Sequence, residues 1–406
     1  MLLYASFVVN NVGASSSSST STSSSLYFFV HADYGKGGYD GYQSNRRKLD
    51  EDKFYYQGKV ADAMALTAAT TPPSFIMALG DNFYPDGVSS VTDSTWQTFY
   101  RDVYYNRFNS LKGVPWHAAV GNHDLGYGDD GIAAMISRSS YSNGNDDGGE
   151  WDMPSRYYTV KYDIPNTSSF VQVIVVDTTW LAPSANGATN EEGGISNVTQ
   201  SLRLFEQMSF LIPTLQATLQ YPRPRWLLVM GHYQVFSGGS KGDSDELVEY
   251  LQPLLAYYNV HAYFCGHDHL MEHLRYSNTE YFVTGASTMN GGLDEDQDSA
   301  AELLWAGENY SGFSRVMVSE AELGVDYIDY NGNTVYSYYM KSNYSSSTDN
   351  DNGNSSEGGK DERDTGRDLG IIGGVVKFTG FAMASISAVY LFLHLYAVLI
   401  SKKNTI

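Results

Sequence analysis

The sequence contains little cysteine and few basic residues. With a single cysteine, Cys265, in 406 residues, a disulfide scaffold, a cysteine-ligated zinc site and an iron–sulfur cluster are excluded. Lys and Arg number 25 against 46 Asp and Glu, which gives a net charge of −21. Nucleic-acid binding favours a basic surface, so we expect no nucleic-acid partner. Hydrophobic residues make up 42%, which is enough apolar side chain to exclude global disorder.

The N-terminal segment joins a short apolar run to a run of hydroxyl side chains. Residues 1–14 fit two interpretations, a signal peptide cut after Ala14 or a disordered start, because no basic residue precedes the apolar run. Residues 15–25 are all Ser or Thr, which predicts a flexible leader that buries nothing.

The C-terminal segment has the composition of a tethered domain. Residues 342–377 are mostly polar, rich in Ser, Asn, Gly and Asp, and predict a disordered linker. Residues 378–400 then carry no formal charge, and as a helix they would extend about 34 Å, enough to cross a bilayer. We therefore expect a C-terminal transmembrane helix that anchors the protein in a membrane, followed by a short tail, residues 401–406.

The side of the membrane on which the large domain lies stays open. Four basic residues precede the apolar segment and two lysines follow it, so the positive-inside rule leans against a lumenal domain. The signal-peptide interpretation favours the secretory pathway, with a lumenal or extracellular domain. Five N-glycosylation sequons add weak support, because composition alone would give nearly as many: Asn166, Asn197, Asn309, Asn343 and Asn354.

Residues 26–341 have the pattern of one globular α/β domain. Short apolar runs at 26–30, 74–79, 171–176, 226–230 and 260–265 are typical of buried strands. Apolar residues at helical spacing lie between them, near Met64 and from Leu247 to Leu255. After residue 280 the pattern changes to Tyr-rich alternating strands, with a hairpin expected at Asn331-Gly332. We expect stacked sheets flanked by helices.

Clusters of polar residues follow five of the predicted strands. In open α/β sheets ligands bind at the carboxyl ends of strands, so these clusters are expected to meet in one crevice. The clustered donors comprise two carboxylates, an amide, a phenol and three imidazoles: Asp33, Asp81, Asn122, Tyr84, His232, His267 and His269.

This set of donors indicates metal binding. Two carboxylates and three imidazoles packed together without a cation would be unfavourable, and a bound cation reverses that balance. Seven nitrogen and oxygen ligands are too many for one four-coordinate zinc and suit two ions sharing a bridging carboxylate. A phenolate favours a hard trivalent ion, most simply Fe(III), at one position.

Five motifs in order carry a resemblance to a known family: Asp33-x-Gly35, Gly80-Asp81-x-x-Tyr84, Gly121-Asn122-His123-Asp124, Gly231-His232 and Gly266-His267-x-His269. The sequence resembles the purple acid phosphatases of the calcineurin-like metallophosphoesterase superfamily, most closely the tartrate-resistant (type 5) form, over roughly residues 26–340. The resemblance implies a four-layer αββα sandwich of two mixed sheets flanked by helices. It also implies a monomeric catalytic domain over 26–341 that hydrolyses phosphate monoesters.

The resemblance further implies a role for each donor. Fe(III) would be held by Asp33, Tyr84 and His269. A divalent ion (Fe, Zn or Mn) would be held by Asn122, His232 and His267, and Asp81 would bridge the two ions. A metal-activated hydroxide would then attack phosphorus.

Two neighbouring residues are candidates for catalysis, and one lysine for substrate binding. His123 would contact phosphate or protonate the leaving group, Asp124 would orient the His123 ring, and Asn122 would also contact substrate. Animal enzymes of this type carry a second pocket histidine where this chain has Lys241, and a proline where it has Gln234. Lys241 is either a phosphate-binding cation or a solvated loop residue.

Two other functions remain alternatives. A dimetal phosphodiesterase of the same superfamily would share most of the ligands, but the phenol of Tyr84 argues against it. A non-catalytic, membrane-tethered binding module would be expected to lose ligands, whereas all seven positions are intact.

Overall fold

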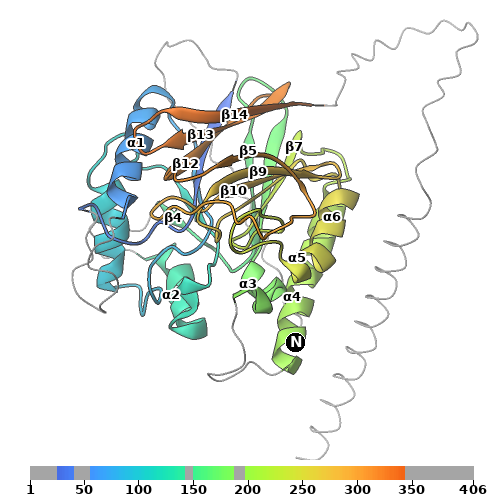
Figure 1. Cartoon of the computed structure of the whole chain (residues 1–406), viewed down its shortest axis with the longest axis horizontal. Helices are drawn as coiled ribbons and strands as arrows, with labels where there is room; N and C mark the ends of the chain where they lie inside the picture. Colours follow the sequence, from blue (N-terminus) through green and yellow to red (C-terminus); the bar gives the residue numbers. More distant parts are fainter. Residues whose placement is uncertain (1–24, 41–54, 142–149, 187–196, 343–406) are drawn as a thin grey trace, which may run out of the picture. The chain divides into compact units, whose positions relative to one another are not determined.

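Two seven-stranded sheets make up the centre of the described fold (Figure 1). The structure is a computed structural model that describes residues 25–40, 55–141, 150–186 and 197–342. The predicted signal peptide, transmembrane helix and tail lie outside these residues, as do nearly all of the leader and linker. Within the ranges that are described, no helix has the length and apolar character needed to span a bilayer.

The first sheet is mixed and has the order β14-β13-β12-β1-β2-β3-β4. Four of its strands are parallel neighbours: β1 (Leu26–His31), β2 (Ile76–Ala78), β3 (Trp116–Ala118) and β4 (Trp151–Asp152). The other three are antiparallel and include the predicted Tyr-rich strands: β12 (Gly312–Val318), β13 (Glu322–Asp329) and β14 (Thr334–Lys341). The hairpin between β13 and β14 turns at Asn331-Gly332 as expected, with Gly332 at φ 83°.

The second sheet is also mixed and has the order β11-β9-β10-β8-β7-β6-β5. Its parallel strands are β6 (Phe170–Val175), β7 (Trp226–Met230), β8 (Ala262–Cys265) and β10 (Thr279–Thr284). Its antiparallel strands are β5 (Tyr158–Asp163), β9 (Met271–Tyr276) and β11 (Glu302–Gly307).

Alternating side chains of the second sheet divide between two apolar clusters. Leu228 and Phe264 belong to the cluster between the sheets, which includes Phe29 and Phe313 of the first sheet. Their neighbours in sequence belong to the other cluster, which the helices cover. The division arises because successive side chains of a strand point to opposite faces. Each central strand is therefore buried on both sides, which explains its continuous apolar sequence.

Helices complete the four predicted layers. Helix α1 (Gln57–Thr70) packs against β12 and β13 of the first sheet. The outer cluster of the second sheet includes side chains from α3 (Thr178–Leu181), α4 (Asn197–Ala217), α5 (Asp245–Tyr250) and α6 (Gln252–Tyr257). The remaining helical segments are a π-helix (Trp96–Tyr105), α2 (Gly128–Arg138) and two 3₁₀ turns (His123–Leu125 and Pro183–Asn186). The α/β sandwich of two mixed sheets is thus confirmed.

The helical pattern from Leu247 to Leu255 forms two short helices rather than one. Helix α5 ends at Tyr250 and α6 begins at Gln252. Pro253 lacks the amide proton that would bond the carbonyl of Glu249, so a continuous helix is interrupted here.

Candidate metal centre

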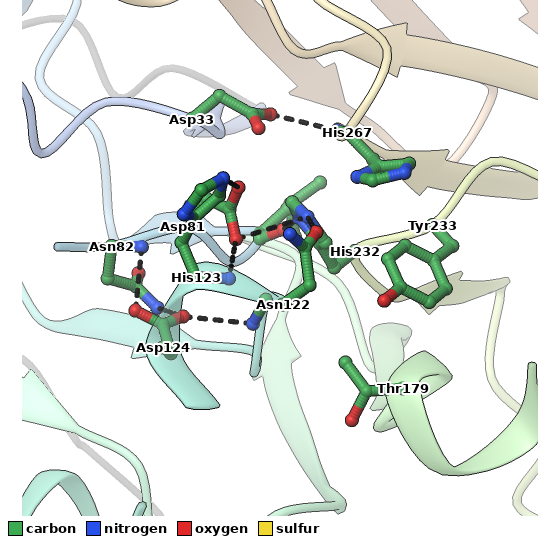
Figure 2. A network of polar contacts seen from close by, with 12 residues as sticks. Asp33, Asp81, Asn82, Asn122, His123, Asp124, Thr179, His232, Tyr233 and His267 are labelled. Atoms are coloured by element: carbon green, nitrogen blue, oxygen red, sulfur yellow. Dashed lines mark hydrogen bonds and ion pairs between the residues drawn. The ribbon is translucent and has the colours of Figure 1, made fainter. Parts of the chain in front are cut away.

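The predicted ligands lie at the carboxyl ends of strands from both sheets (Figure 2). Asp33, Asp81 and Asn122 follow β1, β2 and β3 of the first sheet. His232 follows β7 and His267 follows β8 of the second. Asp33, Asp81 and His232 each offer a ligand atom within 4.8 Å of the others, and all three are buried. The site therefore lies where the two sheets meet.

The three residues proposed for Fe(III) contact one another. Tyr84 Oη donates a hydrogen bond to Asp33 Oδ1 at 3.0 Å. His269 Nε2 lies 3.4 Å from Asp33 Oδ1 and 3.4 Å from Tyr84 Oη. Burial opposes ionisation of Asp33, but the hydrogen bond from His269 and the charges of nearby histidines outweigh it and lower the pKa of this carboxyl. Asp33 therefore presents an anionic carboxylate to the centre.

His232 directs one ring nitrogen to a carbonyl and the other to two side-chain oxygens. Its Nδ1 lies 2.8 Å from the carbonyl of Leu79, which only accepts, so Nδ1 carries the ring proton. Its Nε2 lies 3.1 Å from Asn122 Oδ1 and 3.3 Å from Asp81 Oδ1. With Nδ1 holding a proton, Nε2 is the ring nitrogen that can bind a metal, and the convergence of this nitrogen with two oxygens fits a cation, which Asp81, Asn122 and His232 would hold.

His267 offers a second unsatisfied nitrogen. Its Nε2 is buried and has no hydrogen-bond partner among the described residues. Burial, and then the charge of His232, hold the pKa of His267 well below its usual value. A neutral imidazole with a free nitrogen is the form that binds a metal.

Unusual backbone geometry brings the ligands together. Asp33, Asp81 and His267 have φ values of 57°, 49° and 68°, a left-handed region that residues other than glycine rarely adopt. At Gly121 an added Cβ would lie 2.3 Å from Asp81 Oδ1, so a glycine is required there. The backbone is therefore strained at three predicted ligands, and Gly121 packs closely against Asp81, where the donors converge.

His123 lies at the edge of the centre. Its backbone N–H donates to Asp81 Oδ1 at 2.8 Å, and its ring Nδ1 lies 2.7 Å from the carbonyl of Pro85. The side chain is 40% exposed, and Nε2 lies 4.0 Å from Asp81 Oδ2. The ring is thus anchored at one nitrogen while the other faces the centre and remains accessible.

The predicted orienting role of Asp124 is wrong. Its buried carboxylate accepts hydrogen bonds from Asn82 Nδ2 at 2.8 Å and from the backbone N–H groups of Asn82 and Gly121 at 3.0 and 2.9 Å. The ring of His123 is instead held by Pro85. The reason is geometric, because adjacent residues of a helical turn point in different directions. Asp124 joins the loops that carry Asp81 and Asn122.

Lys241 and Gln234, where the family has histidine and proline, lie on the loop after His232. Lys241 is exposed, and its backbone N–H donates to Asp268 Oδ2 at 3.1 Å. The buried Gln234 donates from Nε2 to the carbonyl of Gly242 at 2.9 Å. The polar side chain in the proline position therefore closes this loop on itself.

Sequence reasoning missed several residues that support the ligands. Thr178 Oγ1 accepts hydrogen bonds from the backbone N–H groups of His232 and Tyr233 at 3.2 and 2.9 Å. Its only sequence signal was its position two residues after the apolar run at 171–176. Asn82 donates a hydrogen bond to Asp124. It lies between Asp81 and Tyr84 in the same motif, and only those two neighbours were predicted as ligands.

The described residues include three of the five predicted glycosylation sequons. Asn166 and Asn309 are exposed on turns, so a glycan would fit at both. Asn197 begins α4, and Asn343 and Asn354 lie outside the described residues. Glycosylation stays a prediction.

The comparisons with known proteins agree with the geometry. Residues 31–271 match the model of the calcineurin-like phosphoesterases, and the chain belongs to that family. Tartrate-resistant acid phosphatase type 5 of Mus musculus is 31% identical over 68% of this chain and 81% of its own length; the Homo sapiens protein is 32% identical over 68% and 82%. Purple acid phosphatase 3 of Arabidopsis thaliana is 27% identical over 70% of this chain and 72% of its own. The resemblance drawn from the motifs is confirmed.

Solved structures share the fold. GAP50, described as the anchor in the inner membrane complex of Plasmodium, has a TM-score of 0.62 at 21% identity, over 79% of this chain and 90% of its own. Purple acid phosphatase PPD1 of yellow lupin (Lupinus luteus) has a TM-score of 0.53 at 15% identity, over 79% and 54%. At these identities the likeness concerns the fold alone.

Proposed function

We propose that the protein is an acid phosphatase that hydrolyses phosphate monoesters at a binuclear Fe(III)–M(II) centre. The observation that carries the proposal is the convergence of His232 Nε2, Asn122 Oδ1 and Asp81 Oδ1, with His232 Nδ1 held by the Leu79 carbonyl. The tartrate-resistant acid phosphatases to which the chain is similar support the choice of a monoester substrate.

The residues present fit two ions. Asp33, Tyr84 and His269 would hold Fe(III); Asn122, His232 and His267 would hold the divalent ion, with Asp81 between them. When bound, the ions supply a nucleophilic hydroxide below neutral pH and neutralise charge on the phosphoryl oxygens.

His123 is the residue best placed to act on the leaving group. Its Nδ1 is fixed against the Pro85 carbonyl, so Nε2 faces the centre. From there it would contact the phosphate and pass a proton to the departing alkoxide. Asn122 would contact the same phosphate, and Asp124 would keep the loops of Asp81 and Asn122 in register.

A direct test combines turnover with metal content. The purified protein should hydrolyse p-nitrophenyl phosphate faster than bis(p-nitrophenyl) phosphate at acidic pH, contain two metal ions and show a visible tyrosinate–Fe(III) absorption band. A preference for the diester, without that band, would favour the dimetal phosphodiesterase instead.

A non-catalytic anchor is the second candidate. It is favoured by the fold likeness to GAP50, which is described as an anchor, and by the apolar segment at 378–400. A protein that binds no metal and hydrolyses neither ester would support this alternative.

Membrane attachment in the secretory pathway is part of the same proposal. Residues 378–400 would form the tether, and the domain would face the lumen or the exterior. The test is fractionation of the full chain with and without residues 378–400, together with a glycosidase-sensitive mass shift. Release of both forms in the soluble fraction would contradict the tether.

A further inference from the structure

The loop that carries Lys241 lies on two buried carboxyl groups. Asp268 stands between His267 and His269, and Glu272 lies in β9. The hydroxyl of Ser237 is 2.9 Å from Asp268 Oδ2 and 2.6 Å from Glu272 Oε2. Ser237 and Glu272 are fully buried, and Asp268 is 3% exposed.

One hydroxyl cannot donate to both carboxylates. Ser237 Oγ has one proton, and it also accepts a hydrogen bond from the Gly239 N–H at 3.0 Å. When the Ser237 proton points to Asp268 Oδ2, which also accepts the Lys241 N–H, a hydrogen bond between Ser237 and Glu272 requires a protonated Glu272 Oε2. Burial, opposed by the Ser237 hydrogen bond and reinforced by the charge of Asp268, raises the pKa of Glu272 to about 7.

The backbone of the loop is fitted to these carboxyls. The Gly238 N–H donates to Glu272 Oε1 at 3.0 Å. A Cβ added at Gly239 would lie 2.5 Å from Asp268 Oδ2, and one at Gly238 would lie 3.2 Å from Glu272 Oε1. Two consecutive glycines therefore let the chain approach closely enough to bond both carboxyls.

The hydrogen bonds between this loop and the two carboxyl groups determine where the backbone of Lys241 lies. Its backbone N–H is bonded to Asp268, the residue between two predicted metal ligands. The side chain itself is exposed and therefore accessible to substrate.

We propose that Ser237, Asp268 and Glu272 form a positioning unit that holds Lys241 beside the metal centre, where its charge selects dianionic phosphate monoesters over monoanionic diesters. The inference rests on the proposed phosphatase function. The ammonium group attracts a doubly charged phosphate more strongly than a singly charged one, so it contributes to specificity as well as to binding.

The experiment uses the full-length, metal-loaded protein. Four single variants are compared with the wild type: Lys241→Ala, Ser237→Ala, Glu272→Gln and, as a matched control, Ser314→Ala. Ser314 is also a fully buried serine, bonded to Thr284 Oγ1 at 2.8 Å in another part of the fold. The readouts are the calorimetric Kd for inorganic phosphate, the ratio of monoester to diester kcat/KM, metal content and Tm.

Each variant has a distinct expected result. Lys241→Ala should weaken phosphate binding and lower the monoester preference by about tenfold each, the size of one charge-assisted hydrogen bond. Ser237→Ala should also weaken phosphate binding and lower the monoester preference. The double variant Ser237→Ala/Lys241→Ala should lose no more of either than Lys241→Ala alone. Glu272→Gln should keep the wild-type phosphate Kd and monoester preference, because the glutamine amide can donate to Ser237 and accept from the Gly238 N–H. Ser314→Ala should change Tm alone.

Three results would overturn the proposal: additive losses in the double variant, an unchanged phosphate Kd in Lys241→Ala, or a loss in Glu272→Gln equal to that in Ser237→Ala. If Ser237→Ala does not fold, Gly239→Ala replaces it, because its Cβ would displace the loop from Asp268. A wild type that binds phosphate and metal but cleaves neither ester contradicts the proposed function, while the phosphate Kd values still test the positioning unit.

Discussion

Tyr84 Oη donates a hydrogen bond to Asp33 Oδ1 at 3.0 Å, and each of these two oxygens lies 3.4 Å from His269 Nε2. Burial and the charges of Asp33 and Asp81 raise the pKa of Tyr84 well above its usual value. The phenol would therefore ionise only when a strong Lewis acid replaces its proton. This relationship makes Tyr84 the most diagnostic residue of the centre.

Replacing Tyr84 with Phe should remove the visible absorption band and lower turnover by at least about a hundredfold, because a phenolate ligand is lost while the buried ring still packs. Absorption spectroscopy and iron analysis of the purified variant provide the measurement. Tyr39→Phe, which removes a phenol bonded to Asp62 away from the predicted ligands, is the control. A variant that retains the band would contradict the assignment of Tyr84.

Asp81→Ala should lose both metal ions, because it removes the carboxylate proposed to bridge them, which also accepts the His123 N–H and faces His232. Elemental analysis should give less than one ion per chain. Asp163→Ala, an exposed carboxylate at the end of β5, should keep the wild-type content. Two retained ions in the Asp81 variant would contradict the bridging role.

His123→Ala should keep the metals and slow turnover by about 10² to 10⁴-fold, the usual contribution of a positioned acid or base. The helical turn should survive, because the backbone N–H that bonds Asp81 is unaffected. Steady-state kinetics with leaving groups of differing pKa provide the sharper measurement. The loss should grow as the leaving group becomes more basic; an equal loss for every ester would leave His123 with phosphate contact alone.

Stability should fall as the pH rises towards neutrality. The pKa of Glu272 is about 7 in the folded protein against 4.5 for an ordinary glutamate, through burial first and then the charges of Asp268 and Asp243. The folded state therefore binds more protons between these values, and the free energy of unfolding falls by up to about 3 kcal/mol across them. Asp124, whose pKa burial and the charge of Asp81 raise to about 7, acts in the same direction.

Glu272→Gln should flatten part of that pH dependence, since the amide does not titrate. Denaturant unfolding between about pH 5 and about pH 7 gives the measurement. The remaining slope is expected from Asp124. An identical slope in the variant and the wild type would show that Glu272 does not hold its proton in the folded state.

The sequence was most informative where burial and chemistry coincide. Runs such as 226–230 are apolar throughout because both faces of the strand are covered, so the strand and the ligand that follows it could be predicted together. The division of the 247–255 helix was also within reach, because Pro253 is visible in the sequence.

Other features depend on contacts between distant parts of the chain. Asp124 was assigned to its sequence neighbour, whereas its partners include Asn82, 42 residues away. The unit of Ser237, Asp268 and Glu272 joins residues 31 and 35 positions apart, and no local pattern marks it. The left-handed conformations at Asp33, Asp81 and His267 are likewise imposed by the assembled site.

The carbonyl that fixes the His232 ring belongs to Leu79, at the end of a first-sheet strand, whereas His232 itself follows a strand of the second sheet. The donors proposed for each ion likewise come from both halves of the sandwich. Loading the ions would consequently lock the two halves together, and chelation should lower the melting temperature even though no apolar contact is removed.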